Sequence, residues 1–198
     1  SGRLFAEVCD AWTARGGRLD GTADALQKTY SLALNSGREL SSIVAETPSL
    51  RGVCLGSLND LLTEYVAAKL ERNVMDYDDL LVYWQLVLYG SSDGADAFRS
   101  RFDAVLVDEY QDVNPLQADI VDQMVSHHHN LTAVGDDYQS IYAFRGADLG
   151  SMLSFEERYP EAVIRPLRFN YRSTPQIVAM GTASIAHNKV QRYKESRS

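Results

Sequence analysis

The sequence predicts an α/β protein in which a helical N-terminal part leads into a short parallel β-sheet. Two apolar runs, residues 104–107 (AVLV) and 131–134 (LTAV), each end in a polar turn that carries acidic residues. Between them lies a stretch with helical spacing, opened by Pro115. Strand, helix and strand in this order predict a parallel βαβ unit whose strands are buried on both faces.

The composition fits a globular protein that does not hold nucleic acid by charge alone. The chain has 198 residues, 45% of them hydrophobic, and a formal net charge of -8. An acidic chain lacks the basic surface that neutralises phosphates, but it can still stack bases on aromatic side chains. No apolar run approaches the roughly 18 residues of a membrane helix, and no signal peptide is evident, so we expect a cytoplasmic protein with no membrane partner.

Two cysteines, Cys9 and Cys54, are too few for a disulfide framework. We predict that both are buried free thiols in a reducing compartment.

Helix signals dominate residues 1–75. Thr22 is placed to cap a helix that Gly37 ends. A second helix is expected over residues 57–70, with Ser57 as its N-cap.

Further elements are expected toward the C-terminus. A helix over residues 78–88 has acids in its first turn, residues 162–167 form a candidate strand, and a last helix runs from Thr174 to about residue 187. We divide the chain into a helical part, residues 1–75, and an α/β part, residues 76–198.

The first apolar run ends in the acidic pair Asp108 and Glu109. In open α/β sheets, ligands bind beyond the carboxyl ends of the strands. One carboxylate there can hold Mg²⁺ through water, and its neighbour can orient or deprotonate an attacking water. A bare acidic pair is also compatible with a solvated turn.

Three segments resemble motifs of one enzyme family in the family's order. They are residues 107–117 (VDEYQD followed by NPLQ), 134–147 (VGDDYQSIYAFRGA) and 169–178 (FNYRSTPQIV). They resemble motifs II, III and IV of the UvrD/Rep-like family of superfamily 1 DNA helicases. Residues 75–81 (MDYDDLL) resemble the segment that precedes the Walker B strand in that family. The resemblance is specific over residues 75–188 and only positional over residues 1–73.

The resemblance implies a partial RecA-like P-loop NTPase sheet with a helical insertion at its N-terminal end. Residues 1–75 would correspond to the inserted subdomain 1B, and residues 76–198 to the later part of subdomain 1A, with motifs II, III and IV.

The same resemblance assigns ATP and Mg²⁺ as cofactors. Asp108 would bind Mg²⁺, and Glu109 would be the catalytic base. Gln139 would sense the γ-phosphate and couple its state to DNA. Tyr171 would stack on adenine, and Arg172 would reach the γ-phosphate as an arginine finger.

Other positions are implied to contact DNA or to link sites. Gln111 and Asp112 would connect the acidic turn to neighbouring motifs. Four residues would lie near single-stranded DNA: Tyr77, Tyr142, Phe144 and Arg145. The family more often has Trp at position 144, so Phe144 offers a smaller stacking face.

Simpler interpretations exist for several of these residues. Tyr142 and Phe144 could be ordinary core residues, and Arg172 could pair on the surface with an acid near Asp136. Residues 127–129 (HHH) suggest a metal site, but consecutive side chains do not readily face one ion, so we predict a solvated turn.

No P-loop is present in the sequence. The pattern GxxxxGK[ST] needs a Gly-Lys pair, and the four lysines follow Gln, Ala, Asn and Tyr. We therefore expect the chain to be an internal piece of a longer helicase, with weak ATP binding and no hydrolysis of its own.

Three functions are compatible with these residues. The favoured one is part of an ATP-dependent 3′-to-5′ DNA helicase acting on single strands and junctions, together with the remaining domains of the parent. The second is a non-catalytic helicase-like module that binds DNA or protein. The third, a metal-dependent nuclease using Asp108, Glu109 and Asp112, explains the acids less well.

Overall fold

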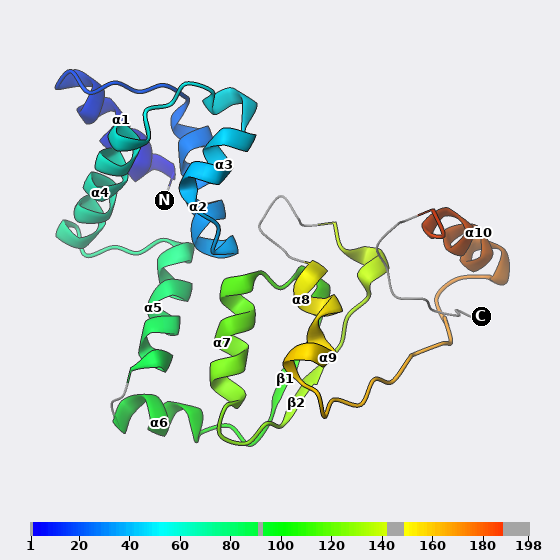
Figure 1. The fold of residues 1–198 in the computed structure, drawn as a ribbon. Coiled ribbons are helices and arrows are strands. Elements are labelled where there is room, and N and C mark those ends of the chain that lie inside the picture. Colours follow the sequence, from blue (N-terminus) through cyan, green and yellow to red (C-terminus); the bar gives the residue numbers. More distant parts are fainter. Residues whose placement is uncertain (1, 91–92, 142–148, 188–198) are drawn as a thin grey trace. The chain divides into compact units, whose positions relative to one another are not determined.

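A computed structural model describes residues 2–90, 93–141 and 149–187 of the chain (Figure 1). It is an α/β structure, mostly helical with a small parallel sheet of two strands. The contacts divide it into two units. One contains Ser1–Val105 and Asn114–Thr132, and the other contains Leu106–Val113 and Ala133–Ser198. The predicted division at residues 75 and 76 stays a prediction.

The N-terminal helices of the first unit pack around one apolar core. They are α1 (Gly2–Ala14), α2 (Ala23–Ser36), α3 (Leu40–Glu46), a 3-10 turn (Pro48–Leu50) and α4 (Leu55–Glu71). Tyr65 of α4 is fully buried, and its ring meets that of Phe5 edge to face with 4.9 Å between centroids. Such a contact adds to the apolar burial of both rings.

The start and end of α2 follow the predicted signals. The Thr22 side chain accepts a hydrogen bond from the Ala25 N–H at 3.2 Å, and Gly37 ends the helix with φ 65°. The left-handed conformation of Gly37 explains the glycine there.

Helix α4 begins earlier than predicted. The carbonyl of Cys54 already accepts a hydrogen bond from the Leu58 N–H at 3.0 Å, so Ser57 lies inside the helix and is not its N-cap. The prediction failed because a serine can occupy a first turn as well as a cap.

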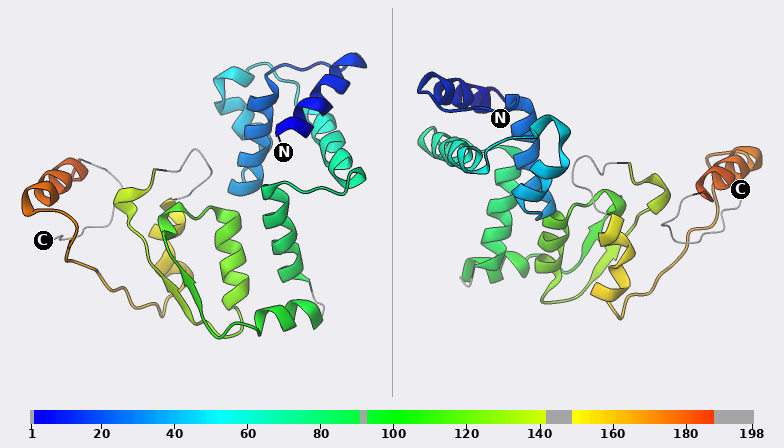
Figure 2. Two further views of the ribbon diagram at one scale, coloured as in Figure 1. Left: turned by 180° about the vertical axis from the view of Figure 1, so that it is seen from behind. Right: turned by 45° about the horizontal axis from the view of Figure 1, so that its top comes forward.

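A second group of helices in the same unit comprises α5 (Tyr77–Tyr89), α6 (Asp93–Arg99) and α7 (Pro115–Val125). Helices α5 and α7 lie side by side (Figure 2). Leu88 of α5 packs with Leu116 and Ile120 of α7 in a small core. Asp76 and Asp79 form a capping box at the start of α5, which therefore begins close to the predicted residue 78.

The predicted βαβ unit is confirmed. Strands β1 (Val105–Val107) and β2 (Leu131–Ala133) are neighbours in the sheet, with α7 between them in the chain. The predicted burial on both faces is wrong, because Leu106 is 77% exposed. Val105 and Val107 point to the opposite, half-buried face, as alternate residues of a strand must.

The rest of the second unit consists of short elements. They are 3-10 helices at Tyr110–Asp112 and Asp137–Gln139, and helices α8 (Leu149–Leu153), α9 (Phe155–Arg158) and α10 (Pro175–Ile185). Helix α10 starts directly after Thr174, as predicted. The predicted strand over residues 162–167 is wrong, because this stretch has no strand partner among the described residues and exposes Val163 and Leu167.

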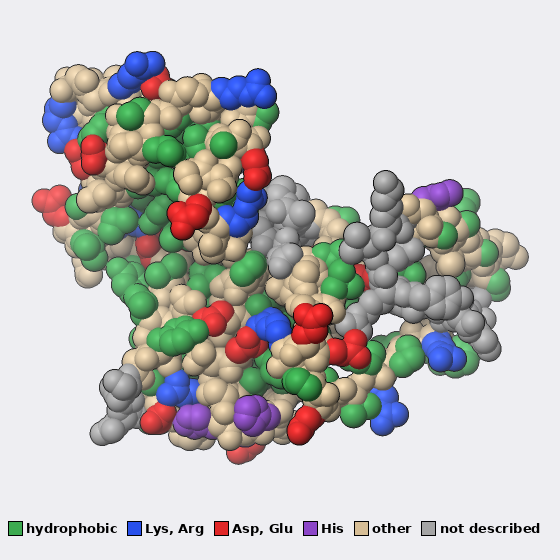
Figure 3. Space-filling model, viewed as in Figure 1, with side chains coloured by type: hydrophobic (Ala, Val, Ile, Leu, Met, Phe, Trp, Pro, Cys, Tyr) green, Lys and Arg blue, Asp and Glu red, His purple; other side chains and the backbone are tan. Residues whose placement is uncertain are grey.

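Two surface predictions have different outcomes. Cys9 is buried and free as predicted, but Cys54 is exposed. The histidine run lies in the turn after α7, where His127 and His129 are exposed; Figure 3 shows histidine side chains at that surface. No group of three His, Cys, Asp or Glu side chains that could hold a metal ion exists in the described part of the chain.

Within residues 2–90, 93–141 and 149–187, no helix is both long and apolar enough to cross a lipid bilayer.

Candidate functional site

The turn that follows β1 holds the acidic pair in a strained conformation. Asp108 and Glu109 are both exposed, and Asp108 Oδ1 accepts a hydrogen bond from the Glu109 N–H at 2.9 Å. Glu109 has φ 52° and ψ 44°, in the left-handed region. A non-glycine residue there costs about 1–3 kcal/mol and persists only where neighbouring contacts enforce it.

Two contacts hold the Glu109 turn in place. The N–H of Tyr110 donates to the carbonyl of Val134 at 2.8 Å, immediately after β2. The Gln111 side chain donates from Nε2 to Glu109 Oε2 at 2.7 Å. The carboxylate predicted to be the base is therefore oriented by a neighbouring amide.

Gln111 also joins this acidic turn to the turn after β2. Its side chain is buried, and Oε1 accepts a hydrogen bond from the Asp136 N–H at 2.9 Å. With both ends of the amide engaged, Gln111 couples the two strand ends directly. In the sequence analysis, only the family resemblance implied a linking role for Gln111.

Gly135 is the residue that permits this close approach. A Cβ atom at this position would lie 2.9 Å from Gln111 Oε1 and 3.2 Å from the backbone nitrogens of Gln111 and Tyr110. Our sequence interpretation missed Gly135. The available signal was a glycine between the second apolar run and the acids that follow it.

Asp136 extends the connection to Gln139. Its Oδ1 accepts from the Tyr138 N–H at 3.1 Å and its Oδ2 from Gln139 Nε2 at 2.9 Å. Glu109, Gln111, Asp136 and Gln139 thus form one continuous hydrogen-bonded series. Asp136 was not among the predicted site residues.

Tyr110 supports the acidic turn from its buried side. It is buried, its ring packs edge to face on Phe155 with 5.3 Å between centroids, and its hydroxyl accepts from Arg158 Nη1 at 3.1 Å. The acidic turn therefore contains a buried aromatic side chain that is held by a ring contact and a hydrogen bond, an arrangement that suits a functional site.

Asp112 contributes an unsatisfied atom. Its Oδ1 is buried and has no hydrogen-bond partner among the described residues. A buried carboxylate oxygen without a partner is costly, so this position favours water or a cation.

The residues present fit a Mg²⁺ ion that keeps part of its water shell. Mg²⁺ commonly keeps several waters and is held by one or two carboxylates plus substrate phosphates. Exposed Asp108 and the unpaired oxygen of Asp112 match that requirement. Among the described residues, no group of three His, Cys, Asp or Glu side chains could hold a metal ion.

Among the described residues, no hydrogen bond or ion pair joins the NYRS segment to the acidic turn. Asn170 Oδ1 accepts from the N–H groups of Arg172 at 3.0 Å and Ser173 at 2.9 Å, which sets a local turn. Tyr171 is 94% exposed, and its ring stacks on Phe169 with 6.3 Å between centroids. In the described part of the chain the Arg172 guanidinium has no ion pair, so the surface pairing near Asp136 is not formed there.

Most of the predicted DNA contacts lie beyond what the structure describes. Tyr142, Phe144 and Arg145 fall within residues 142–148, outside the described residues. Tyr77 is described: it is the first residue of α5 and is 85% exposed.

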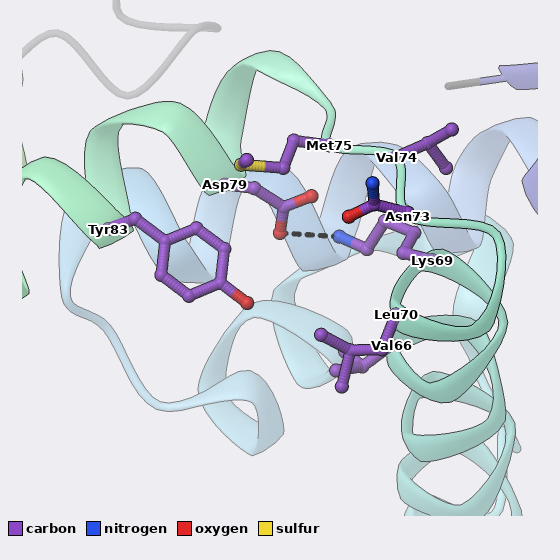
Figure 4. A pocket seen from close by; sticks show the side chains of 8 residues that line it. All are labelled: Val66, Lys69, Leu70, Asn73, Val74, Met75, Asp79 and Tyr83. Atoms are coloured by element: carbon purple, nitrogen blue, oxygen red, sulfur yellow. Dashed lines mark hydrogen bonds and ion pairs between the residues drawn. The ribbon is translucent and has the colours of Figure 1, made fainter.

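A separate pocket lies in the first unit between α4 and α5 (Figure 4). Its volume is about 250 Å³, and none of the predicted site residues lines it. Lys69 borders it, with Nζ 2.6 Å from Asp79 Oδ1 and 3.0 Å from Asp76 Oδ2. Burial lowers the pKa of Lys69, but the hydrogen bonds to Asp79 and Asp76 outweigh burial and raise the pKa above its ordinary value. These acids are fully engaged in the fold.

Comparison with known families decides the class of the chain. The sequence model described as "UvrD/REP helicase N-terminal domain" matches residues 39–160, more than half of the chain. The chain belongs to the UvrD/REP helicase N-terminal domain family. The matched region of this UvrD/REP chain includes the whole series from Glu109 to Gln139.

Several curated proteins are similar to this UvrD/REP chain. A "Probable DNA helicase II homolog" of Mycoplasma capricolum is 37% identical over 131 residues, which cover 66% of the chain and 18% of that protein. An "ATP-dependent DNA helicase UvrD2" of Mycobacterium tuberculosis is 38% identical over 127 residues, with 63% and 18% covered. An "ATP-dependent DNA helicase PcrA" of Staphylococcus epidermidis is 38% identical over 144 residues, with 69% and 20% covered. The chain therefore spans about a fifth of the length of these relatives.

Proposed function

We propose that this chain is the part of an ATP-dependent DNA helicase that supplies the Mg²⁺-binding and water-activating acids. The observation that carries the proposal is the Gln111 bridge, which ties Glu109 to the turn after β2. Family membership and the names of the relatives, which are DNA helicases, support it. The helicase would move 3′ to 5′ along single-stranded DNA and act at junctions with duplex DNA.

At the acidic turn, three carboxylates would have two roles. Asp108 and Asp112 would hold Mg²⁺, which would supply charge stabilisation to the phosphates when bound. Glu109 would orient the attacking water and accept its proton, because Gln111 holds its carboxylate at 2.7 Å.

Gln139 would report the state of the γ-phosphate. Its amide is held by Asp136, and Asp136 is held in turn by Gln111 through its backbone N–H. A displacement at either end of this series would change the hydrogen bonds at the other. Hydrogen-bond networks of this kind can carry coupling between two sites.

Tyr171 and Arg172 would complete the nucleotide contacts. Tyr171 would stack on adenine, and Arg172 would form a bidentate contact with the γ-phosphate. Both side chains are exposed, which a group that must reach a ligand requires. An arginine finger of this kind is worth about 10³–10⁵ in rate.

Single-stranded DNA would be held mainly by stacking. Tyr77, Tyr142, Phe144 and Arg145 are the proposed contacts. Stacking contributes about 1–3 kcal/mol per base and tolerates any sequence, which suits a translocating motor with an acidic chain.

We also propose that the sheet is part of a RecA-like motor domain. Residues 76–198 would form its later part, and residues 1–75 the inserted helical subdomain. The remaining domains of the helicase are the proposed partners, and the exposed apolar side chains Leu80 and Val87 of α5 support such an association. Figure 3 shows hydrophobic side chains among the surface atoms of α5. The cytoplasmic location stays a prediction.

The chain by itself should not hydrolyse ATP, because its sequence has no Gly-Lys pair to hold the phosphates. Titration of the 198-residue chain with Mg·ATP should show binding no tighter than millimolar. Micromolar affinity would contradict this part of the proposal.

The proposed activity is tested on the complete protein that contains this sequence. ATP hydrolysis should rise with single-stranded DNA, and strand displacement should require a 3′ single-stranded tail. Binding without turnover would instead favour the non-catalytic module, and Mg²⁺-dependent DNA cleavage would favour the nuclease.

A further inference from the structure

Three polar side chains, two of them buried, form a hydrogen-bonded chain that the proposed function does not use: Asn35 of α2, partly buried Asp78 of α5, and Asn114, the N-cap of α7. Asn114 Nδ2 donates to Asn35 Oδ1 at 2.9 Å, and Asn35 Nδ2 donates to Asp78 Oδ1 at 2.7 Å. Asn35 and Asn114 are each 6% exposed. All three residues lie in the first unit, and α2 contacts both α5 and α7.

The direction of each amide is fixed by its partners. Asn35 Nδ2 also donates to the carbonyl of Ser31 at 2.8 Å, so two acceptors face its nitrogen and its oxygen must face Asn114. Asn114 Nδ2 donates to that oxygen of Asn35. Asn114 Oδ1 is then free to accept a hydrogen bond from the N–H of Gln117 at 2.8 Å.

Asn114 stands at a sensitive position in the chain. It is the N-cap of α7, and with Gln117 it forms a capping box. It follows Asp112 by two residues, so the turn that carries the acidic pair ends at this cap. The boundary between the two units also falls between Val113 and Asn114.

We propose that Asn35 is a positioning residue for ATP hydrolysis: held by Asp78, its side-chain amide orients Asn114 and so fixes the end of the catalytic turn. The inference rests on the proposed function. Asn35 lies outside the residues that match the family, so a helix of the N-terminal part holds the residue that follows the motif II turn in the chain. Movement of α2 would change ATP turnover through this contact.

The test uses one disrupting variant, one restoring variant and one matched control. Asn35→Asp places a carboxylate against Asp78 and the Ser31 carbonyl. The double variant Asn35→Asp, Asp78→Asn restores a donor opposite position 35 and keeps an acceptor for Asn114. Asn59→Asp makes the same change on an exposed face of α4.

The first readout is residue-resolved amide hydrogen exchange on the chain itself. Asn35→Asp should speed exchange at least tenfold at the Gln117 amide and at the Asp112 and Val113 amides of the turn. In the double variant, the exchange rates of these amides should return most of the way to the wild-type values. Asn59→Asp should leave these rates unchanged. Unchanged exchange at these amides, or an equal rise throughout the chain, would overturn the inference.

The second readout is ATP turnover by the complete protein. Asn35→Asp should lower kcat about three- to thirtyfold with KM within twofold, the range expected for residues that couple sites, and the double variant should regain part of kcat. An unchanged kcat beside altered exchange would overturn the positioning role. A wild-type protein without ATP turnover would contradict the proposed function, whereas the exchange result would still decide whether Asn35 orders the turn.

Discussion

Two aromatic-acidic segments of this chain look alike in sequence and differ in the structure. In DYDD, residues 76–79, the acids are engaged: Asp76 and Asp79 bind buried Lys69, and Asp78 binds Asn35. In DEYQD, residues 108–112, the acidic pair is exposed, Glu109 is in a left-handed conformation and Asp112 keeps a buried oxygen without a partner among the described residues.

The difference separates an acid that stabilises the fold from one that is available for chemistry. Buried ions need partners, and the acids around Lys69 have them. Strain and unsatisfied groups concentrate at functional sites, and the turn after β1, where we propose that the catalytic acids lie, has both. The number of acids in a motif does not make this distinction, but their hydrogen bonds do.

The largest expected effect comes from breaking the engaged cluster. Lys69, whose side chain is 5% exposed, binds two acids, so Lys69→Met leaves both carboxylates without their cation. Removing one partner of a buried ion pair costs about 3–5 kcal/mol. Urea unfolding of the chain should show this loss. Lys28→Met breaks an exposed pair with Asp24 and should cost about 0.3–0.5 kcal/mol.

The same cluster predicts a pH dependence. Burial raises the pKa of Asp76, but its hydrogen bonds from Asp79, Lys69 and Tyr65 outweigh burial and hold the pKa below its ordinary value. A depressed carboxyl pKa gives stability that is present above the unfolded-state pKa and is lost as pH falls through the folded-state pKa. Acid unfolding should therefore begin at higher pH in Lys69→Met than in the unmodified chain. Identical acid transitions would contradict the assignment.

A smaller loss of stability is expected at Gly135, where the turn after β2 lies close to the turn after β1. Gly135→Ala would place a methyl group 2.9 Å from Gln111 Oε1, so the Gln111 bridge must shift. Overpacking of this kind costs about 1–3 kcal/mol. Gly181→Ala in α10, where nothing lies within 4 Å, should be neutral or stabilising. Equal effects of the two substitutions would show that the approach is not tight.

The smallest predicted effect has the opposite sign. Asp112→Asn removes the charge from a buried oxygen that has no partner among the described residues, so it should stabilise the chain by about 0.5–1.5 kcal/mol without Mg²⁺. Asp60→Asn, on an exposed face of α4, should change stability by less than about 0.5 kcal/mol. A marked loss of stability in Asp112→Asn would mean that the carboxylate serves the fold.

Local signals predicted most of the elements, and the two wrong predictions about strands share one cause. Thr22 and Gly37 were identified because a cap depends on a few adjacent residues. The exposure of Leu106 and the absence of a strand at residues 162–167 depend on neighbours that one segment does not reveal. A run of apolar residues has the same sequence whether or not another layer covers it.

The site follows the same rule. Asp108 and Glu109 were predicted because they directly follow an apolar run. Two contacts of the structure join distant positions: Asp136 with Gln111, 25 residues apart, and Asn114 with Asn35, 79 residues apart. No local sequence pattern predicts such contacts, and only the three-dimensional structure shows them.

The contrast between the two acidic segments is tested most directly by Glu109→Gln in the complete protein, with ATP hydrolysis and nucleotide binding measured on the same preparation. A glutamine keeps the size of the side chain and a carbonyl to accept from Gln111, but it cannot take a proton from water. Hydrolysis should fall at least about 10²-fold, the lower range for loss of a general base, while nucleotide affinity stays within about threefold. Hydrolysis that continues at the original rate would contradict the assignment of Glu109.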